Sequence, residues 1–240
     1  MRIDKFLSEM GAATRKETAQ AARRGAIKIN GEVCRAPDRH IDPEKDTVSY
    51  YESIIPYKRF RYIMLNKPEG YVSATEDGIS PTVLELLPRE YSRFNLFPCG
   101  RLDKNTVGLM LLTDDGELAH RLLSPKRHVS KVYEYKSKFP LSDEDRKMLE
   151  EGVTLDDGYE TLPSHIELDD GAMSGRITLT EGKYHQIKRM FEAVGNKITA
   201  LERIKFGPLS LDASLGRGEW RELTEAEIRA LEAHAGKGQT

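Results

Sequence analysis

The sequence has little of what metal or disulfide sites require. Among its 240 residues there are two cysteines, Cys34 and Cys99, and their separation fits no metal-binding spacing. The six histidines form no pair at the spacing of two ligands on one helix, so we expect no metal site. Because nothing in the sequence indicates secretion, we interpret the two cysteines as reduced structural thiols.

Long apolar runs are also missing. No stretch approaches the roughly 20 residues that a membrane-spanning helix needs, and residues 1–5 lack the apolar core of a signal peptide. We therefore expect a cytoplasmic protein that does not contact a membrane. The sequence has no glycine-rich Walker or dinucleotide loop and no nucleophile-elbow motif, so it gives no indication of a nucleotide cofactor or a serine triad.

Neither sign of charge is in large excess, since 37 Lys and Arg face 39 Asp and Glu for a net charge of −2. A balanced total neither supports nor excludes a nucleic-acid partner, because local clustering decides that question. Hydrophobic residues make up 38% of the chain and charged residues 32%. This composition is typical of a folded protein with a core and not of a disordered one.

The first fifty residues predict a small compact unit. Residues 2–10 have apolar side chains at the spacing of one helix face. Thr14 and Glu17 have the form of a capping box that begins a second helix. Asn30-Gly31 lies between two short alternating segments and predicts a hairpin turn. Two short helices packed on a small hairpin would complete this unit.

The rest of the chain predicts a larger unit. We place the first unit at residues 1–51, a linker at residues 52–61 and the second unit at residues 62–235. In the second unit strand patterns outnumber short helices and no βαβ repeat is visible, which favours an α+β fold around a mixed, largely antiparallel sheet. Residues 236–240 are expected to form a disordered tail.

One stretch of the second unit, Gly100–Thr113, joins a polar loop to an apolar run. The run Val107–Leu112 has the length and composition of a strand buried on both faces. Asp103 would lie on the loop that leads into this strand, where a functional side chain can be held accurately. Taken alone, Asp103 has an ordinary alternative as a charged residue of a solvated turn.

Three separate motifs resemble those of a known family. They are Asn66–Tyr71 (NKPEGY), Gly100–Leu109 (GRLDKNTVGL) and Gly182–Phe191 (GKYHQIKRMF). Their order and spacing resemble the pseudouridine synthases, and the first fifty residues resemble the S4 RNA-binding domain. An S4-like domain in front of these motifs is similar to the RsuA branch, whose members modify ribosomal RNA. The resemblance therefore implies a small S4-like αα-hairpin domain followed by a pseudouridine synthase catalytic domain.

This resemblance implies a reaction and its residues. The protein would isomerise a specific uridine of small-subunit (16S) ribosomal RNA to pseudouridine, with the uridine flipped out of its stack. Asp103 matches the family's catalytic aspartate, Lys188 its basic partner, and Tyr133 the tyrosine that stacks on the base. Whether Asp103 attacks C1′, attacks the base or abstracts a 2′ proton stays open. None of these routes needs a metal or another cofactor.

The resemblance also implies a pocket and an RNA-binding surface. Leu201 matches an apolar pocket residue, and Arg101 and Arg189 are further pocket candidates. In the S4-like domain the second helix and the loop beside it would contact RNA phosphates. The basic residues at that place are Arg15, Lys16, Arg23 and Arg24, which would otherwise be a solvated helix face.

The expected partner is ribosomal RNA within an assembly intermediate of the small subunit, bound by a monomer of this chain. One alternative is a large-subunit ribosomal RNA synthase of the same family. Another is an RNA-binding assembly factor that has lost catalysis. The presence of Asp103, Tyr133 and Lys188 together argues against that last alternative, because a binding module needs no carboxylate facing an anionic polymer.

Overall fold

The computed structural model describes residues 1–236 and divides into two compact units. The first comprises Met1–Phe60 together with Pro88–Asn95, and the second comprises Arg61–Leu87 and the chain from Leu96 onward. Each unit is described by itself.

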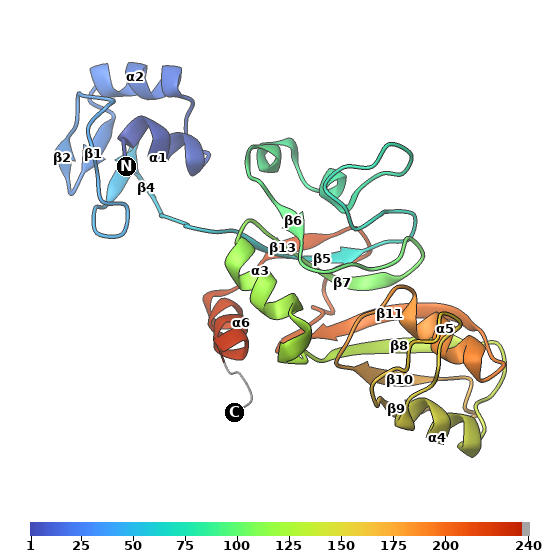
Figure 1. Ribbon diagram of the computed structural model, residues 1–240. Coiled ribbons are helices and arrows are strands. Elements are labelled where there is room, and N and C mark those ends of the chain that lie inside the picture. The colour runs from blue at the N-terminus through green and yellow to red at the C-terminus, as the bar shows by residue number, and fades with distance from the viewer. Residues whose placement is uncertain (237–240) are drawn as a thin grey trace. The chain divides into compact units, whose positions relative to one another are not determined.

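The first unit packs two helices against a small antiparallel sheet (Figure 1). Its core is formed by apolar side chains of both helices and of the sheet, including Ile3, Phe6, Leu7, Ala21, Ile27 and Val48. The strands are ordered β2-β1-β3-β4. The elements are α1 (Ile3–Glu9), α2 (Arg15–Arg23), β1 (Ile27–Ile29), β2 (Glu32–Val33), β3 (Val48–Tyr50) and β4 (Ser53–Ile55).

Local sequence signals explain how these elements begin and turn. The backbone N–H of Glu17 donates to the Thr14 hydroxyl at 3.3 Å, and the Thr14 N–H donates to the Glu17 carboxylate at 2.7 Å. This capping box is the predicted one. Asn30 and Gly31 have φ values of 52° and 86°, the positive pair that a type I′ turn requires. The strand β4, however, lies in the stretch expected to be a linker, so the sheet extends further along the chain than predicted.

The second unit is built on a nine-stranded sheet. Its continuous order is β13-β5-β7-β11-β8-β10-β9, with β6 paired to β7 and β12 paired to β11. Among the described strands only β7 and β11 pair in parallel, which confirms a mixed, largely antiparallel sheet. The strands are β5 (Tyr62–Lys67), β6 (Phe97–Pro98), β7 (Val107–Thr113), β8 (Lys131–Ser137), β9 (His165–Leu168), β10 (Ser174–Leu179), β11 (Ile198–Phe206), β12 (Leu209–Ser210) and β13 (Trp220–Glu222).

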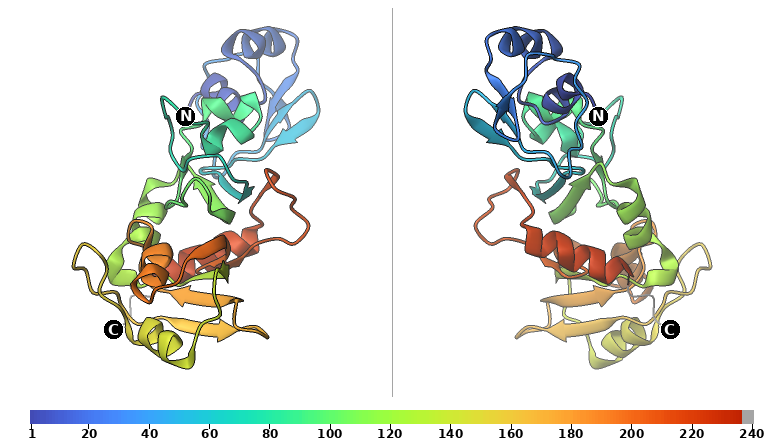
Figure 2. Two further views of the ribbon diagram at one scale, coloured as in Figure 1. Left: turned by 90° about the vertical axis from the view of Figure 1, so that its right-hand side faces the viewer. Right: turned by 90° about the vertical axis from the view of Figure 1, so that its left-hand side faces the viewer.

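Short helices accompany this sheet. In Figures 1 and 2, α5 lies beside β11 and α4 beside β9, while α3 packs against α6. No helix within residues 1–236 has the length and apolarity needed to cross a bilayer. The helices are α3 (Gly116–Leu123), α4 (Asp143–Glu151), α5 (Gln186–Ala193) and α6 (Glu225–Gly236), with 3₁₀ turns at Val83–Leu86 and Pro125–Arg127. A further 3₁₀ turn, Arg89–Arg93, belongs to the first unit.

One sequence expectation differs from the structure in this unit. Gly236, predicted as the start of a disordered tail, is the last residue of α6. The rest of that predicted tail, residues 237–240, lies outside the described residues.

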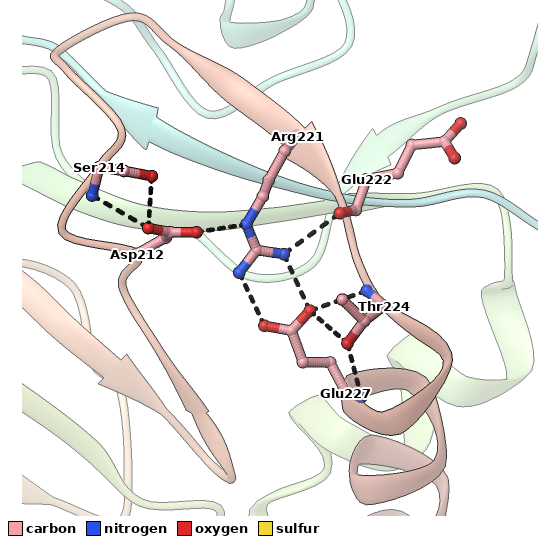
Figure 3. Close-up of polar contacts among 6 residues, drawn as sticks. All are labelled: Asp212, Ser214, Arg221, Glu222, Thr224 and Glu227. Atoms are coloured by element: carbon pink, nitrogen blue, oxygen red, sulfur yellow. Dashed lines mark hydrogen bonds and ion pairs between the residues drawn. The ribbon is translucent and has the colours of Figure 1, made fainter.

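Arg221 ties α6 to the edge of the sheet (Figure 3). Its Nε donates to Asp212 at 2.6 Å, and both terminal nitrogens donate to the Glu227 carboxylate at 2.8 Å. The hydrogen bond from Arg221 lowers the pKa of Glu227 to about 2, and hydrogen bonds from Ser214 and then Arg221 lower the pKa of Asp212 to about 2. Because both carboxyls have depressed pKa values in the folded chain, their stabilising contribution is present at neutral pH and lost as the pH falls toward 2.

The parallel contact between β7 and β11 requires a glycine. Gly108 has φ 99° and pairs with Arg203. A Cβ at Gly108 would lie 2.4 Å from the carbonyl oxygen of Arg203 and 2.9 Å from its backbone nitrogen. The two backbones can therefore approach only where a side chain is missing, and β7 is fixed in the centre of the sheet.

We predict that Gly108→Ala lowers the free energy of unfolding by about 2–4 kcal/mol. The change combines a strained backbone conformation, at about 1–3 kcal/mol, with overpacking, also at about 1–3 kcal/mol. Urea unfolding followed by circular dichroism measures it. Gly78→Ala is the matched control, because a Cβ there meets nothing within 4 Å. Equal stabilities of the two variants would contradict the role assigned to the close approach.

Candidate active site

A cavity of about 800 Å³ opens in the second unit. Its wall is formed by the loop before β7, by one face of β8 and β11, and by the turn that leads into α5. Five residues that the sequence assigns to the site line it: Arg101, Asp103, Tyr133, Lys188 and Leu201. They come from four separate segments, so the fold brings together what the sequence holds far apart.

The Asp103 carboxylate forms the polar centre of this cavity. Its Oδ2 accepts a hydrogen bond from the Lys188 ammonium at 2.7 Å, and its Oδ1 lies 3.5 Å from Nε2 of His185. The Asp103 and Lys188 side chains are 25% and 27% exposed. A cation at this distance offsets the cost of withdrawing the carboxylate partly from water, and a quarter of each side chain stays open to an incoming substrate.

A buried lysine holds the loop that carries Asp103. Lys67, at the end of β5, is fully buried. Its ammonium donates to the backbone carbonyls of Asp103 at 3.0 Å, Lys104 at 3.2 Å and Thr106 at 2.8 Å, and also to that of Pro68 at 3.1 Å. Burial lowers the pKa of Lys67 to about 8. The backbone oxygens of the loop thus converge on one cation, which fixes the position of Asp103.

A serine holds the same loop from its other side. The Ser73 hydroxyl donates to the carbonyl of Leu102 at 2.9 Å and accepts from the Leu102 N–H at 3.0 Å. Both residues are buried. Ser73 thus holds the residue before Asp103, and Lys67 holds the carbonyls of Asp103 and of the residues after it. The backbone is therefore restrained on both sides of Asp103.

The sheet supplies the apolar part of the cavity. Tyr133 on β8 lies directly opposite Arg203 on β11, and Leu201 lies opposite Tyr135. Because alternate residues of a strand share a face, Tyr133 and Leu201 project from the same side of the sheet. They are 8% and 7% exposed. A flat ring and a branched aliphatic side chain therefore border the space next to Asp103.

Arg189 is the predicted pocket residue that the structure places elsewhere. It does not line the cavity, and its guanidinium pairs instead with Asp156 and, at 2.8 Å, with Asp157. Arg189 follows Lys188 on α5, and successive residues of a helix point about 100° apart. The helix therefore directs one of the two cations to Asp103 and the other to a neighbouring loop.

Several residues in or behind the cavity wall were not identified from the sequence. Lys67 belongs to a quoted motif, but nothing local distinguishes it from a surface lysine. His185 has a left-handed backbone conformation with φ 49° and stacks on Tyr184 with the ring centroids 3.8 Å apart. Lys131 and Arg203 also line the cavity. A basic residue between apolar positions of a strand is the only signal that could have indicated them.

The four basic residues predicted to bind RNA lie in the first unit. Two are in the first turn of α2, one is in its last turn and one follows it. The buried side of this helix carries Thr18, Ala21 and Ala22. Within residues 1–236 no carboxylate forms a salt bridge with any of the four, which are Arg15, Lys16, Arg23 and Arg24, and all four are exposed.

Comparison with known proteins matches both units. A family model described as RNA pseudouridylate synthase matches residues 61–193, and an S4 domain model matches residues 1–48. The chain is 47% identical over 234 residues to the "Uncharacterized RNA pseudouridine synthase YtzG" of Bacillus subtilis (strain 168), which covers 96% of this chain and 98% of the relative.

Two further relatives are similar over nearly their full length. The chain is 38% identical over 232 residues to the "Ribosomal small subunit pseudouridine synthase A" of Escherichia coli (strain K12), covering 96% of this chain and 100% of that protein. A solved structure described as "Crystal structure of pseudouridylate synthase" superposes with a TM-score of 0.68 at 38% identity, covering 96% of this chain and 99% of the other.

We predict that Lys67→Met lowers the free energy of unfolding by about 2–4 kcal/mol at pH 7.5. Methionine is of similar length but leaves buried carbonyl oxygens without a donor, at about 1–3 kcal/mol for each oxygen that water cannot reach. Urea unfolding measures the change. Lys104→Met is the control, because the Lys104 side chain is exposed and its ammonium donates to Ser80 at 3.0 Å. Equal losses in the two variants would contradict the anchoring role.

We also predict that the difference in the free energy of unfolding between the wild type and Lys67→Met depends on pH. Burial depresses the pKa of Lys67 in the folded chain from 10.5 to about 8, so between these values the unfolded chain binds more protons than the folded one. The free energy of unfolding of the wild type therefore rises relative to that of Lys67→Met above pH 8, by up to about 1.4 kcal/mol per pH unit. Unfolding at pH 7.5 and pH 9.5 tests this, and a constant difference would refute it.

Proposed function

From the premise that this chain belongs to the RNA pseudouridylate synthase family, and so is an isomerase, we propose that it converts a specific uridine of small-subunit ribosomal RNA to pseudouridine. The name of the Escherichia coli relative supports the choice of the small subunit over the large one. The match of residues 1–48 to the S4 domain supports an RNA substrate.

The observation that carries the proposal is the Asp103–Lys188 pair inside a cavity large enough for a nucleoside. Converting uridine to pseudouridine breaks the bond between C1′ and N1, turns the base and joins C1′ to C5. N1 gains a proton and C5 loses one, so the product is an isomer and nothing is oxidised. The proposed role of Asp103 is to act at the sugar or the base as nucleophile or proton acceptor.

Lys188 would keep the carboxylate in place for this role. Attack on C1′, attack on the base and abstraction of the 2′ proton each require a carboxylate oxygen whose position does not depend on water. The 2.7 Å ion pair on one side and the anchored backbone on the other meet this requirement. The Lys188 ammonium also compensates negative charge close to the phosphates of the substrate.

The base must leave the RNA stack to reach this carboxylate. Unstacking costs a few kcal/mol, which stacking on an aromatic ring in the enzyme partly returns. Tyr133 offers such a ring, and Leu201 can contact the base from the neighbouring strand. We propose that the flipped uracil lies against Tyr133 and Leu201 with its ribose toward Asp103. Arg101, which is exposed at the cavity, is proposed to contact the RNA beside the flipped nucleotide.

The four basic residues on and after α2 are proposed to bind RNA phosphates. Their exposure and their lack of salt bridges within the described chain leave their charges available. Contacts of this kind provide affinity and orientation and little sequence discrimination. That the substrate is an assembly intermediate, and that the chain acts as a monomer in the cytoplasm, stay predictions.

We predict that Asp103→Asn abolishes pseudouridine formation, with at least about a 10³-fold loss of kcat, while the affinity for RNA stays within about twofold. The amide has the shape of the carboxylate but cannot act as nucleophile or base. Release of tritium from RNA that carries [5-³H]uridine measures turnover. Separate small-subunit and large-subunit RNA substrates identify the target.

Asp170→Asn is the control for this experiment, because Asp170 is an exposed turn residue outside the cavity. Turnover by Asp103→Asn at the rate of this control would refute the assigned role. Turnover by the wild type on large-subunit RNA alone would refute the proposed substrate.

A second prediction concerns the first unit. Replacing all four basic residues at α2 by glutamate should weaken RNA binding and lower the salt dependence of log Kd by about 3, since each phosphate contact contributes about 0.7–0.9 to that slope. Titrations at several salt concentrations measure both quantities. The control reverses the same number of exposed cations in the second unit, namely Lys138, Lys147, Lys205 and Arg229. An equal loss of slope in the control would contradict a specific surface at α2.

A further inference from the structure

Two cations in the wall of the cavity, Lys131 and Arg203, have no carboxylate partner within residues 1–236. Arg203 is 1% exposed. Its Nε donates to the carbonyl of Leu109 at 2.8 Å, and its guanidinium lies 5.2 Å from the centre of the Phe206 ring. The Lys131 ammonium donates to the carbonyl of Val129 at 2.8 Å. Both cations therefore contact only neutral groups.

Within the described chain Lys67 also lacks a carboxylate, but its ammonium donates to four backbone carbonyls, whereas Lys131 and Arg203 each donate to one. Two other arginines of the same unit, the exposed Arg217 and the partly buried Arg221, each pair with a carboxylate through two nitrogens. Burying a guanidinium without an anion costs free energy, and a second cation beside it raises that cost. Burial, followed by the charge of Arg203, lowers the pKa of Lys131 to about 8. Negative charge entering the cavity would relieve both effects.

The sheet register fixes where that negative charge would lie. Arg203 is directly opposite Tyr133 on the neighbouring strand, and Lys131 is two residues before Tyr133 on the same strand. All three side chains project from one face of the sheet, with neighbouring Cβ atoms about 5–7 Å apart. A base stacked on Tyr133 would thus be bordered by a cation on two sides.

We infer that Lys131 and Arg203 are catalytic residues that stabilise the negative charge developing on the uracil during the reaction. When the bond between C1′ and N1 breaks, its electron pair stays with the base and spreads over N1, O2 and O4. In one route C1′ meanwhile gains an Asp103 oxygen, which leaves again when C5 attacks C1′. In another route C2′ gives its proton to Asp103 as a C1′=C2′ double bond forms, and the proton returns to C2′ when C5 joins C1′. If Asp103 adds to C6 of the base instead, the electron pair of the C5=C6 bond moves to O4, and the bond between Asp103 and C6 breaks after C5 has joined C1′. In each route the uracil becomes anionic, and C5 then joins C1′ and loses its proton while N1 gains one.

The inference rests on the proposed function, and it explains why these two cations lack a carboxylate of their own. A permanent counter-ion would compete with the base for them. The uracil is uncharged before the reaction and anionic in the intermediate. An unpaired cation therefore stabilises the intermediate more than the ground state, and this difference is the condition for acceleration. A phosphate of the RNA is the other source of negative charge, and the experiment separates the two.

The test replaces Lys131, which is only partly buried, and leaves Arg203 and its structural contacts unchanged. Lys131→Met should lower kcat by about 10²-fold, with the Kd for RNA and its salt dependence unchanged. Lys131→Arg should recover most of the activity. Lys136→Met is the control, because Lys136 is exposed and projects from the opposite face of β8.

A pH profile adds a readout that a structural role would not change. The titratable groups around the Lys131 ammonium are Arg203 from β11, the neutral thiol of Cys99 after β6 and Glu181 after β10. With its pKa lowered to about 8, as that of Lys67 is, Lys131 loses its proton in mildly alkaline solution, so kcat of the wild type should fall above pH 8. Lys131→Arg should keep its activity to at least one pH unit higher, because arginine stays charged.

The outcomes are distinct. A Lys131→Met variant with unchanged kcat overturns the inference. A Lys131→Met variant that binds RNA more weakly, with a salt dependence of log Kd lower by about 1 and an unchanged kcat at saturating RNA, also overturns the inference. That result would identify Lys131 as a phosphate contact. Circular dichroism melting of each variant identifies misfolding, in which case Lys131→Gln takes its place. A wild type that forms no pseudouridine in ribosomal RNA overturns the proposed function instead, together with this inference.

Discussion

The buried ammonium of Lys67 is the interaction on which the site depends. Without it the loop from Asp103 to Thr106 would present carbonyl oxygens to a dry interior, and folding would leave them without donors. The Lys67 ammonium donates to these carbonyl oxygens from one position and so fixes the loop. The position of the Asp103 carboxylate therefore follows from hydrogen bonding of its backbone as well as from the ion pair with Lys188.

Cations outnumber carboxylates around this cavity even though the whole chain has a net charge of −2. Lys67 donates to backbone oxygens, and Lys188 donates to the Asp103 carboxylate. Lys131 and Arg203 contact no carboxylate of the described chain and donate to backbone carbonyls instead. Lys67 and Lys188 thus have different kinds of partner, and within residues 1–236 Lys131 and Arg203 have no anionic one. Composition could not indicate this distribution, because it depends on which face of β8 and β11 each side chain occupies.

The sequence predicts best those features that are local. The capping box of α2, the turn at Asn30-Gly31 and the fully buried strand β7 follow from adjacent residues and agree with the structure. Short strands such as β4 contain too few residues for a period to be recognised, and their existence depends on a neighbouring edge. Asp103, Tyr133, Lys188 and Leu201 were grouped through motif resemblance, and the residue spacing alone would not have joined them.

Lys67 and Arg189 show why the rest could not be predicted. Three of the four carbonyls that bind Lys67 lie 36 to 39 residues further along the chain, so no window of sequence contains both the donor and these acceptors. Arg189 is adjacent to Lys188 and identical to it in charge, yet one helical step directs it to Asp156 and Asp157 instead. The role of a basic residue here is decided by the direction of its side chain, which the tertiary fold sets. It follows that unpaired, inward-facing cations such as Arg203 carry more functional information than the number of basic residues in a motif.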